Sequence, residues 1–283
     1  MKTNLPSHRG PLSRACRHSL QALAAAGLLF GGLGTATSRA DILYVANGGD
    51  STIEKFTSGG VGSVFASTGL NAPTALAFDS AGNLYAANLN SSTIAKFTPG
   101  GTRSVFASTG LNVPTGIAFD SAGNLYVANR GDNTIEKFMS DGTGSVFASS
   151  GLSVPTGLAF DSAGNLYVGN AGTNLIEKFT PGGVGSIFAS SGLNLPVGLA
   201  FDSTGNLYVA SVANSTIAKF TPDGTGSVFA SSGLSQSQLL AFTDDAGVPL
   251  PLANQVPEPA TCAMLALGAV ALFGRQRHRP TAR

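Results

Sequence analysis

The chain has 283 residues, of which 43% are hydrophobic and 11% are charged, and its formal net charge is +1. Residues 41–255 hold seven basic and fourteen acidic side chains, a net charge of −7, and this acidic composition without a basic stripe argues against nucleic acid as a partner. All three histidines and both cysteines lie outside this region, so it has neither a disulfide framework nor a thiolate zinc site. With 37 glycines, 17 phenylalanines and no long helical pattern, an all-β fold is expected.

Residues 1–40 have the pattern of a secretory signal peptide. A basic leader precedes an apolar run from Leu20 to Leu33, and Ser38 and Ala40 are small residues at the two positions that a signal peptidase inspects. We therefore expect export, cleavage by signal peptidase and a mature body that begins at Asp41.

A unit of 41 residues recurs through the body. All five tyrosines stand in the same L-Y-(V/A) setting, each 41 residues after the last: Tyr44, Tyr85, Tyr126, Tyr167 and Tyr208. A period of this size, with turn residues between short apolar runs, is the signature of a propeller blade or another stacked repeat. In the copy at 73–108, the turn residues predict four strands, at 74–78, 84–87, 93–97 and 104–107.

Phenylalanine and the ends of the repeat array predict how the blades pack and close. Fifteen of the 17 phenylalanines occupy three repeat positions, exemplified by Phe78, Phe97 and Phe106, and we expect them to form the core between blades, an aromatic ligand platform being the alternative. The first copy begins in its second strand, at 42–46, and a lone first strand follows at 238–242. We expect a five-bladed propeller over 41–246, in which 238–242 completes the N-terminal blade and closes the ring.

The repeat pattern resembles that of a known propeller family. P-T-G-(I/L)-A-F-D-x-x-G-N-L-Y-V-A-N, followed by T-I-x-K-F, is similar to NHL-type repeats, which are related to gluconolactonase and streptogramin lyase propellers. The resemblance covers most of the body. Those relatives usually have six blades, and six units of 41 residues would not fit between residues 41 and 255. The lyases use histidine, which residues 41–255 lack, whereas the gluconolactonases hold a metal through oxygen ligands.

The C-terminal part has the pattern of a sorting signal. Residues 247–255 are predicted as a linker, and beyond it Val256, Pro257, Glu258 and Pro259 precede an apolar run at 260–273 and an arginine-rich end. This order resembles the PEP-CTERM signal, which implies recognition by an exosortase in a Gram-negative envelope and cleavage near the motif. We expect 260–273 to form a short membrane helix that passes transiently through the inner membrane, with its basic flank in the cytoplasm; a C-terminal helix without a sorting role is the alternative.

The ends of the predicted second strands carry the candidate ligand-binding residues. Four copies have an amide there and the fifth has a hydroxyl: Asn47, Asn88, Asn129, Asn170 and Ser211. We expect this ring on the rim opposite the D-S-(A/T)-G-N turns, where it either caps turns or holds a sugar or a metal. The loops that follow differ between copies, and one of them spells R-G-D, so Arg130 and Asp132 join the candidate rim.

Repeated carboxylates favour a structural role over catalysis. The turn aspartates, which recur identically, are predicted to cap their own turns, with calcium binding as the alternative: Asp79, Asp120, Asp161 and Asp202. We single out no catalytic residue and expect no cofactor, a calcium or other divalent ion being the alternative. The leading prediction is a secreted, non-catalytic propeller that binds a glycan or protein at the cell surface or in the extracellular matrix. The alternative is a metal-dependent hydrolase or lactonase of the gluconolactonase kind.

Overall fold

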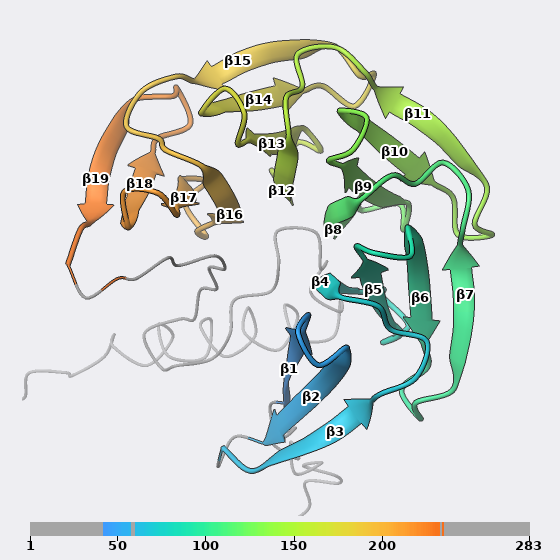
Figure 1. Cartoon of the computed structure of the whole chain (residues 1–283). Helices are drawn as coiled ribbons and strands as arrows, with labels where there is room; N and C mark the ends of the chain where they lie inside the picture. The colour runs from blue at the N-terminus through green and yellow to red at the C-terminus, as the bar shows by residue number, and fades with distance from the viewer. Residues whose placement is uncertain (1–41, 58–59, 233, 235–283) are drawn as a thin grey trace, which may run out of the picture. The chain divides into compact units, whose positions relative to one another are not determined.

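The computed structural model describes residues 42–57, 60–232 and 234. Within this part of the chain, nineteen strands form five antiparallel sheets, which are the blades of a propeller (Figure 1). Blade 1 has three strands, β1 (Ile42–Asn47), β2 (Thr52–Thr57) and β3 (Gly62–Ala66).

The other four blades have four strands each, in chain order. Blade 2 contains β4 (Pro73–Phe78), β5 (Leu84–Asn88), β6 (Thr93–Phe97) and β7 (Arg103–Ala107). Blade 3 contains β8 (Pro114–Phe119), β9 (Leu125–Asn129), β10 (Thr134–Phe138) and β11 (Gly144–Ala148). Blade 4 contains β12 (Pro155–Phe160), β13 (Leu166–Asn170), β14 (Leu175–Phe179) and β15 (Gly185–Ala189). Blade 5 contains β16 (Pro196–Phe201), β17 (Leu207–Ser211), β18 (Thr216–Phe220) and β19 (Gly226–Ala230).

The all-β class, the five blades and the 41-residue spacing are confirmed. The four strands predicted from turn residues match β4 to β7 to within one residue at each end. The predicted closing strand at 238–242 lies outside the described residues, as do the signal peptide, the linker and the sorting segment. The predicted membrane helix is not supported: the described residues contain no helix long and apolar enough to cross a membrane, and 260–273 is not among them.

The first strand of each four-stranded blade lies nearest the centre of the propeller and the last lies at the periphery (Figure 1). Inner strands of neighbouring blades approach closely because their glycines have no side chain. A Cβ on Gly116 would overlap the Thr156 carbonyl oxygen, and one on Gly157 would overlap that of Val197. The threonine of the P-T-G motif donates to the next blade, as Thr115 Oγ1 does to the Pro155 carbonyl at 2.9 Å. The motif therefore joins blades at the centre.

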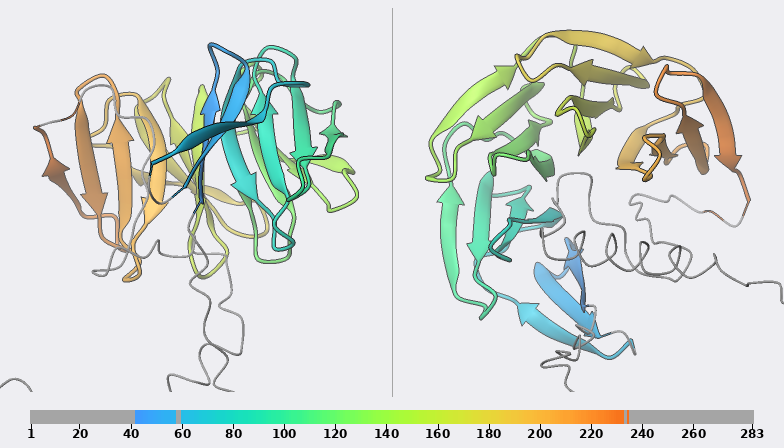
Figure 2. Two further views of the ribbon diagram at one scale, coloured as in Figure 1. Left: turned by 90° about the horizontal axis from the view of Figure 1, so that it is seen from below. Right: turned by 180° about the vertical axis from the view of Figure 1, so that it is seen from behind.

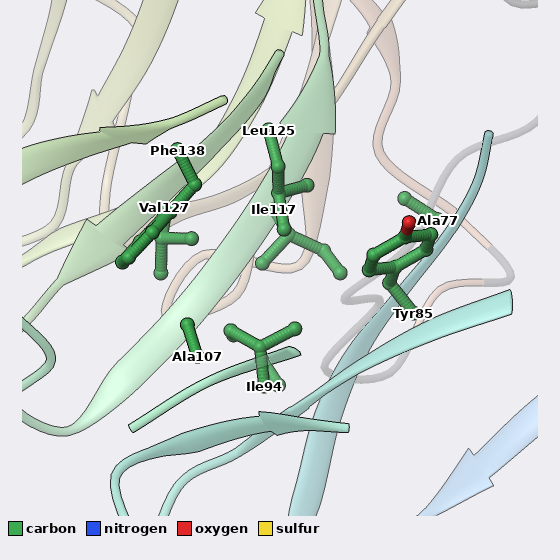
Figure 3. Packing of buried hydrophobic residues seen from close by; sticks show 9 residues of the cluster. Ala77, Tyr85, Ile94, Ala107, Ile117, Leu125, Val127 and Phe138 are labelled. Carbon is green, nitrogen blue, oxygen red and sulfur yellow. The ribbon is translucent and has the colours of Figure 1, made fainter. Parts of the chain in front are cut away.

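The hydrophobic core lies between blades. In strand β6, Ile94 and Phe97 point to opposite faces and are 0% and 1% exposed, as the three-residue spacing predicted. Ile94 packs with blade 3 residues such as Val127 and Phe138 (Figure 3). Phe97 packs in the cluster shared with blade 1. Each interior blade is therefore covered on both faces.

An aromatic cluster repeats at every interface between described blades. Between blades 2 and 3, the Tyr85 ring meets Phe106 of its own blade edge-on at 5.0 Å and Phe119 of the next blade at 4.9 Å. Phe106 in turn meets Phe138 at 6.1 Å. Edge-to-face pairs contribute about 0.5–1.5 kcal/mol each beyond area burial. The three phenylalanine positions thus serve the interface core, as predicted from their periodicity.

Candidate binding site

The blades present two rims, seen edge-on in the left view of Figure 2. One rim carries the aspartate turns between the first and second strands. Asp79 Oδ1 accepts the backbone N–H groups of Ala81 and Asn83, at 3.0 and 2.8 Å, and its Oδ2 accepts Asn83 Nδ2 at 2.7 Å. The other three turn aspartates make the same bonds. The prediction that these carboxylates cap their own turns is confirmed.

A lysine and a tyrosine add to this turn. Lys96 Nζ lies 3.8 Å from Asp79 Oδ2 and 5.1 Å from the centre of the Tyr85 ring, and Tyr85 donates to Asp79 at 3.2 Å. Although burial alone raises the pKa of Asp79, the hydrogen bonds and Lys96 hold it below the ordinary value. Burial is also the main cause of the raised pKa of Tyr85. These groups stabilise each other, which leaves the Asp79 carboxylate little capacity for a ligand.

The opposite rim carries the candidate amides, and in blades 2 to 4 their side chains are buried beneath the rim loops. Asn129 is 0% exposed: its Oδ1 accepts the Asn112 backbone N–H at 3.2 Å, and its Nδ2 donates to the Gly110 carbonyl at 2.8 Å and to Thr134 Oγ1. Asn88 makes the equivalent three bonds. Asn170 and Ser211 are also buried and bind the corresponding loops. In blades 2 to 5 these side chains clamp the loop that enters their own blade.

The rim loops are also tied between blades. Val113, which precedes Pro114, has a positive φ of 52°, a conformation that costs a β-branched residue free energy. Its N–H donates to Ser92 Oγ of the preceding blade at 3.2 Å, and its carbonyl accepts the Arg130 N–H at 3.1 Å. The same inter-blade bond recurs at Ala72, Val154 and Leu195. These bonds hold the rim backbone as a fixed platform.

What this rim leaves exposed are the loop residues that differ from blade to blade. Arg130 and Asp132 are both exposed, and Asp132 accepts the Thr134 hydroxyl at 2.8 Å. Exposed positions in the other loops are Asp50, Asn90, Ser91, Thr173 and Asn214. The rim therefore combines a constant buried frame with a variable polar surface.

A second feature was missed by sequence reasoning: a slot on the side of blades 2 to 5. We define the side slot by three residues, namely the middle residue of the third strand, the first residue of the fourth strand, and the glycine of the loop that enters the blade. In blade 3 these are Glu136, Gly144 and Gly110, and in blade 4 they are Glu177, Gly185 and Gly151. A Cβ on Gly110 or on Gly151 would lie 2.9 Å from the glutamate Oε1, so the carboxylate occupies the space above the glycine.

Both glutamates are buried, at 5% and 6% exposure, and burial raises the pKa of each. In blade 4 the slot opens into a pocket of about 410 Å³ whose lining is largely apolar: Gly151, Leu152, Ser153, Thr173, Leu175, Glu177 and Ile187. The sequence did contain a signal for this feature, because the middle residue of the third strand is Glu in three copies and Ala in two, Ala95 and Ala218.

Comparisons with known proteins agree with this architecture. Residues 111–138 match the NHL repeat family, and residues 255–278 match the PEP-CTERM protein-sorting motif. The second match indicates export and sorting to the envelope in bacteria. No curated protein matches the sequence significantly.

Solved propellers share the fold at low sequence identity. A chain of a nidogen/laminin complex is 23% identical with a TM-score of 0.64, over 71% of this chain and 80% of that chain. Virginiamycin B lyase from Staphylococcus aureus is 15% identical with a TM-score of 0.61, over 71% of each chain. A gluconolactonase from Xanthomonas campestris is 20% identical with a TM-score of 0.59, over 70% of this chain and 74% of that chain. At these identities the likeness establishes the fold alone.

Proposed function

We propose that this protein is a non-catalytic binding module of the bacterial envelope or extracellular matrix, which holds a glycan or a protein on its variable rim. Export and envelope sorting follow from the sorting motif; the Gram-negative envelope, signal peptidase and exosortase as processing partners, and the matrix location are part of the proposal. One of the similar folds comes from a nidogen/laminin complex, a protein assembly, which is compatible with a binding role.

One observation carries the proposal: in blades 2 to 5 the repeated polar groups are used internally, whereas the exposed rim residues differ between blades. Buried, hydrogen-bonded amides such as Asn129 do not offer lone pairs to a ligand. Among the described residues, no three histidine, cysteine or acidic side chains gather as a metal site would need. Surface loops on a rigid frame are the usual place for recognition.

The test is to compare binding with turnover in the purified protein. We expect ligand capture on a glycan array or from matrix proteins, weakened by Arg130→Ala with Asp132→Ala and unchanged by the turn variant Asp141→Asn on the other rim. The same preparation should show no lactone or ester hydrolysis with added Ca²⁺ or Zn²⁺. Metal-dependent turnover that persists through rigorous purification would instead establish the hydrolase alternative.

A further inference from the structure

The Glu177 side chain is buried at 6% exposure, and its carboxylate reaches solvent only through the pocket that it lines. Within the described part of the chain its carboxylate accepts no hydrogen bond and forms no ion pair, and it faces the pocket beside Leu152, Leu175 and Ile187. Partial desolvation disfavours the charged form of this unpaired carboxylate, and a bound cation with matching donors would stabilise it. The slot of blade 4 therefore combines an anionic group, which suits a cation, with a pocket lined mainly by apolar side chains.

Blade 2 shows which group fits such a slot. There the middle residue of the third strand is Ala95, and the first residue of the fourth strand is Arg103 instead of glycine. The Arg103 side chain lies over Gly69, where a Cβ would overlap it, so the Arg103 Nε and guanidinium carbon occupy the space that the carboxylate takes over Gly110 and Gly151. With alanine at the glutamate position, the slot of blade 2 is therefore wide enough for a guanidinium group, and in blade 4 the open space for such a group is the pocket beside Glu177.

Blade 5 provides the empty case. Its slot has Ala218 and Gly226, and a Cβ on Gly192 would meet nothing within 4 Å. The space over the loop glycine is thus filled by an arginine in blade 2, by a glutamate in blades 3 and 4, and by neither in blade 5.

We propose that the side slot of blade 4 binds the guanidinium group of an arginine presented by a partner protein, with Glu177 as the receiving anion. The inference rests on the proposed binding function and deepens it by naming the chemistry of one contact. A guanidinium is planar, weakly hydrated and offers paired donors to a carboxylate, while the arginine methylenes pack on leucine and isoleucine. An ammonium group is more strongly hydrated and fits this apolar opening less well.

The test uses an arginine tripeptide, Ac-Gly-Arg-Gly-amide, added to the isotope-labelled full-length protein. Amide NMR signals of Gly151 and Gly185 should shift, and those of Gly192 and Gly226 in the empty slot should not. The peptide with citrulline, which is neutral and of the same shape, should bind at least about tenfold more weakly, since it lacks the charge. The lysine peptide should lie between the two.

Two variants decide the role of the carboxylate. Glu177→Gln keeps the shape of the side chain and should reduce arginine affinity to the citrulline level. Ala218→Glu should create the site in blade 5, so that Gly192 and Gly226 begin to shift. Equal binding of arginine and citrulline, full binding by Glu177→Gln, or no shift at Gly151 and Gly185 at saturating peptide would each overturn the proposal.

The pH dependence of arginine-peptide affinity tests the role of Glu177 independently, since the other residues that line the blade 4 pocket carry no titratable side chain. Burial raises the pKa of Glu177, so at acid pH the carboxyl holds a proton that a guanidinium must displace. Affinity should rise as pH passes through this raised pKa and stay constant above it. The variant Arg130→Ala with Asp132→Ala should leave the peptide shifts intact, so failure of the rim proposal and failure of the slot proposal are distinguishable.

Discussion

Equivalent repeat positions are buried at the interfaces between interior blades and exposed at the two ends of the described array. Between blades 2 and 3, Leu125 is 0% exposed, whereas its equivalent in blade 1, Leu43, is 63% exposed. At the other end, Phe229 is 59% exposed, whereas its equivalent Phe147 is half-buried against blade 4. Each end of the described array therefore exposes one half of an interface of this kind.

The repeat identifies a segment that fits between these halves. Residues 238–242 carry the first-strand pattern and end in Phe242, which stands 41 residues after Phe201. Phe201 packs edge-on against Tyr167 at 5.0 Å, so Phe242 would be placed against the cluster of Tyr208 and Phe229. We propose that 238–242 pairs beside β1 as the fourth strand of blade 1 and covers both ends.

Deleting 238–242 is the strongest test of this proposal. Loss of Leu239, Leu240 and Phe242 from a buried strand should cost about 5 kcal/mol or more, at about 1.5–3 kcal/mol for each side chain. This corresponds to a fall in Tm of about 10 °C or more for a body of this size. A five-residue deletion within the predicted linker, 248–252, is the control and should leave Tm unchanged. Equal melting of the two deletions would refute the closing strand.

A matched pair of phenylalanine variants compares the stability contribution of one repeat position at an interior interface and at the end of the array. Phe147→Ala should cost about 2–3 kcal/mol, because its ring packs on Tyr126 and Phe179. With the ring closed, Phe229→Ala should cost about as much in urea unfolding. If Phe229 instead stays in solvent, its loss will be within about 0.5 kcal/mol of neutral, and the ends of the array do not form an interface.

The smallest expected effect concerns the buried rim amides that hold the loop entering their own blade. Asn129→Ala removes three hydrogen bonds and leaves buried donors and acceptors unsatisfied, so we expect a loss of about 1–3 kcal/mol. Asn47 donates to Thr52 in the described structure, and by repeat spacing its remaining partners would be Gly233 and Ser235. If the ring is closed, Asn47→Ala should lose a similar amount of stability in thermal unfolding. A loss several-fold smaller would mean that Gly233 and Ser235 do not bind Asn47.

Sequence alone predicted the features that repeat and the contacts that are local. Strand positions, the Tyr85 and Phe106 interface and the Asp79 cap all follow from periodicity or from residues within one turn. The role of Asn129 was left open, because its partners lie 17 and 19 residues earlier in the chain. The burial of Glu177 was missed because the alternation in L-I-E-K-F suggests an exposed side chain, and Glu177 becomes buried only where the loop at Gly151 crosses it.

The identity of the interfaces has a consequence for how such a chain can change length. Each blade presents one face with tyrosine and phenylalanine and an opposite face that accepts them, so any blade can follow any other. Duplication or loss of a 41-residue unit by recombination between the near-identical repeats would then create no new contact. The number of blades is accordingly a property that selection can adjust one unit at a time, with the strain of closing the circle as the physical limit.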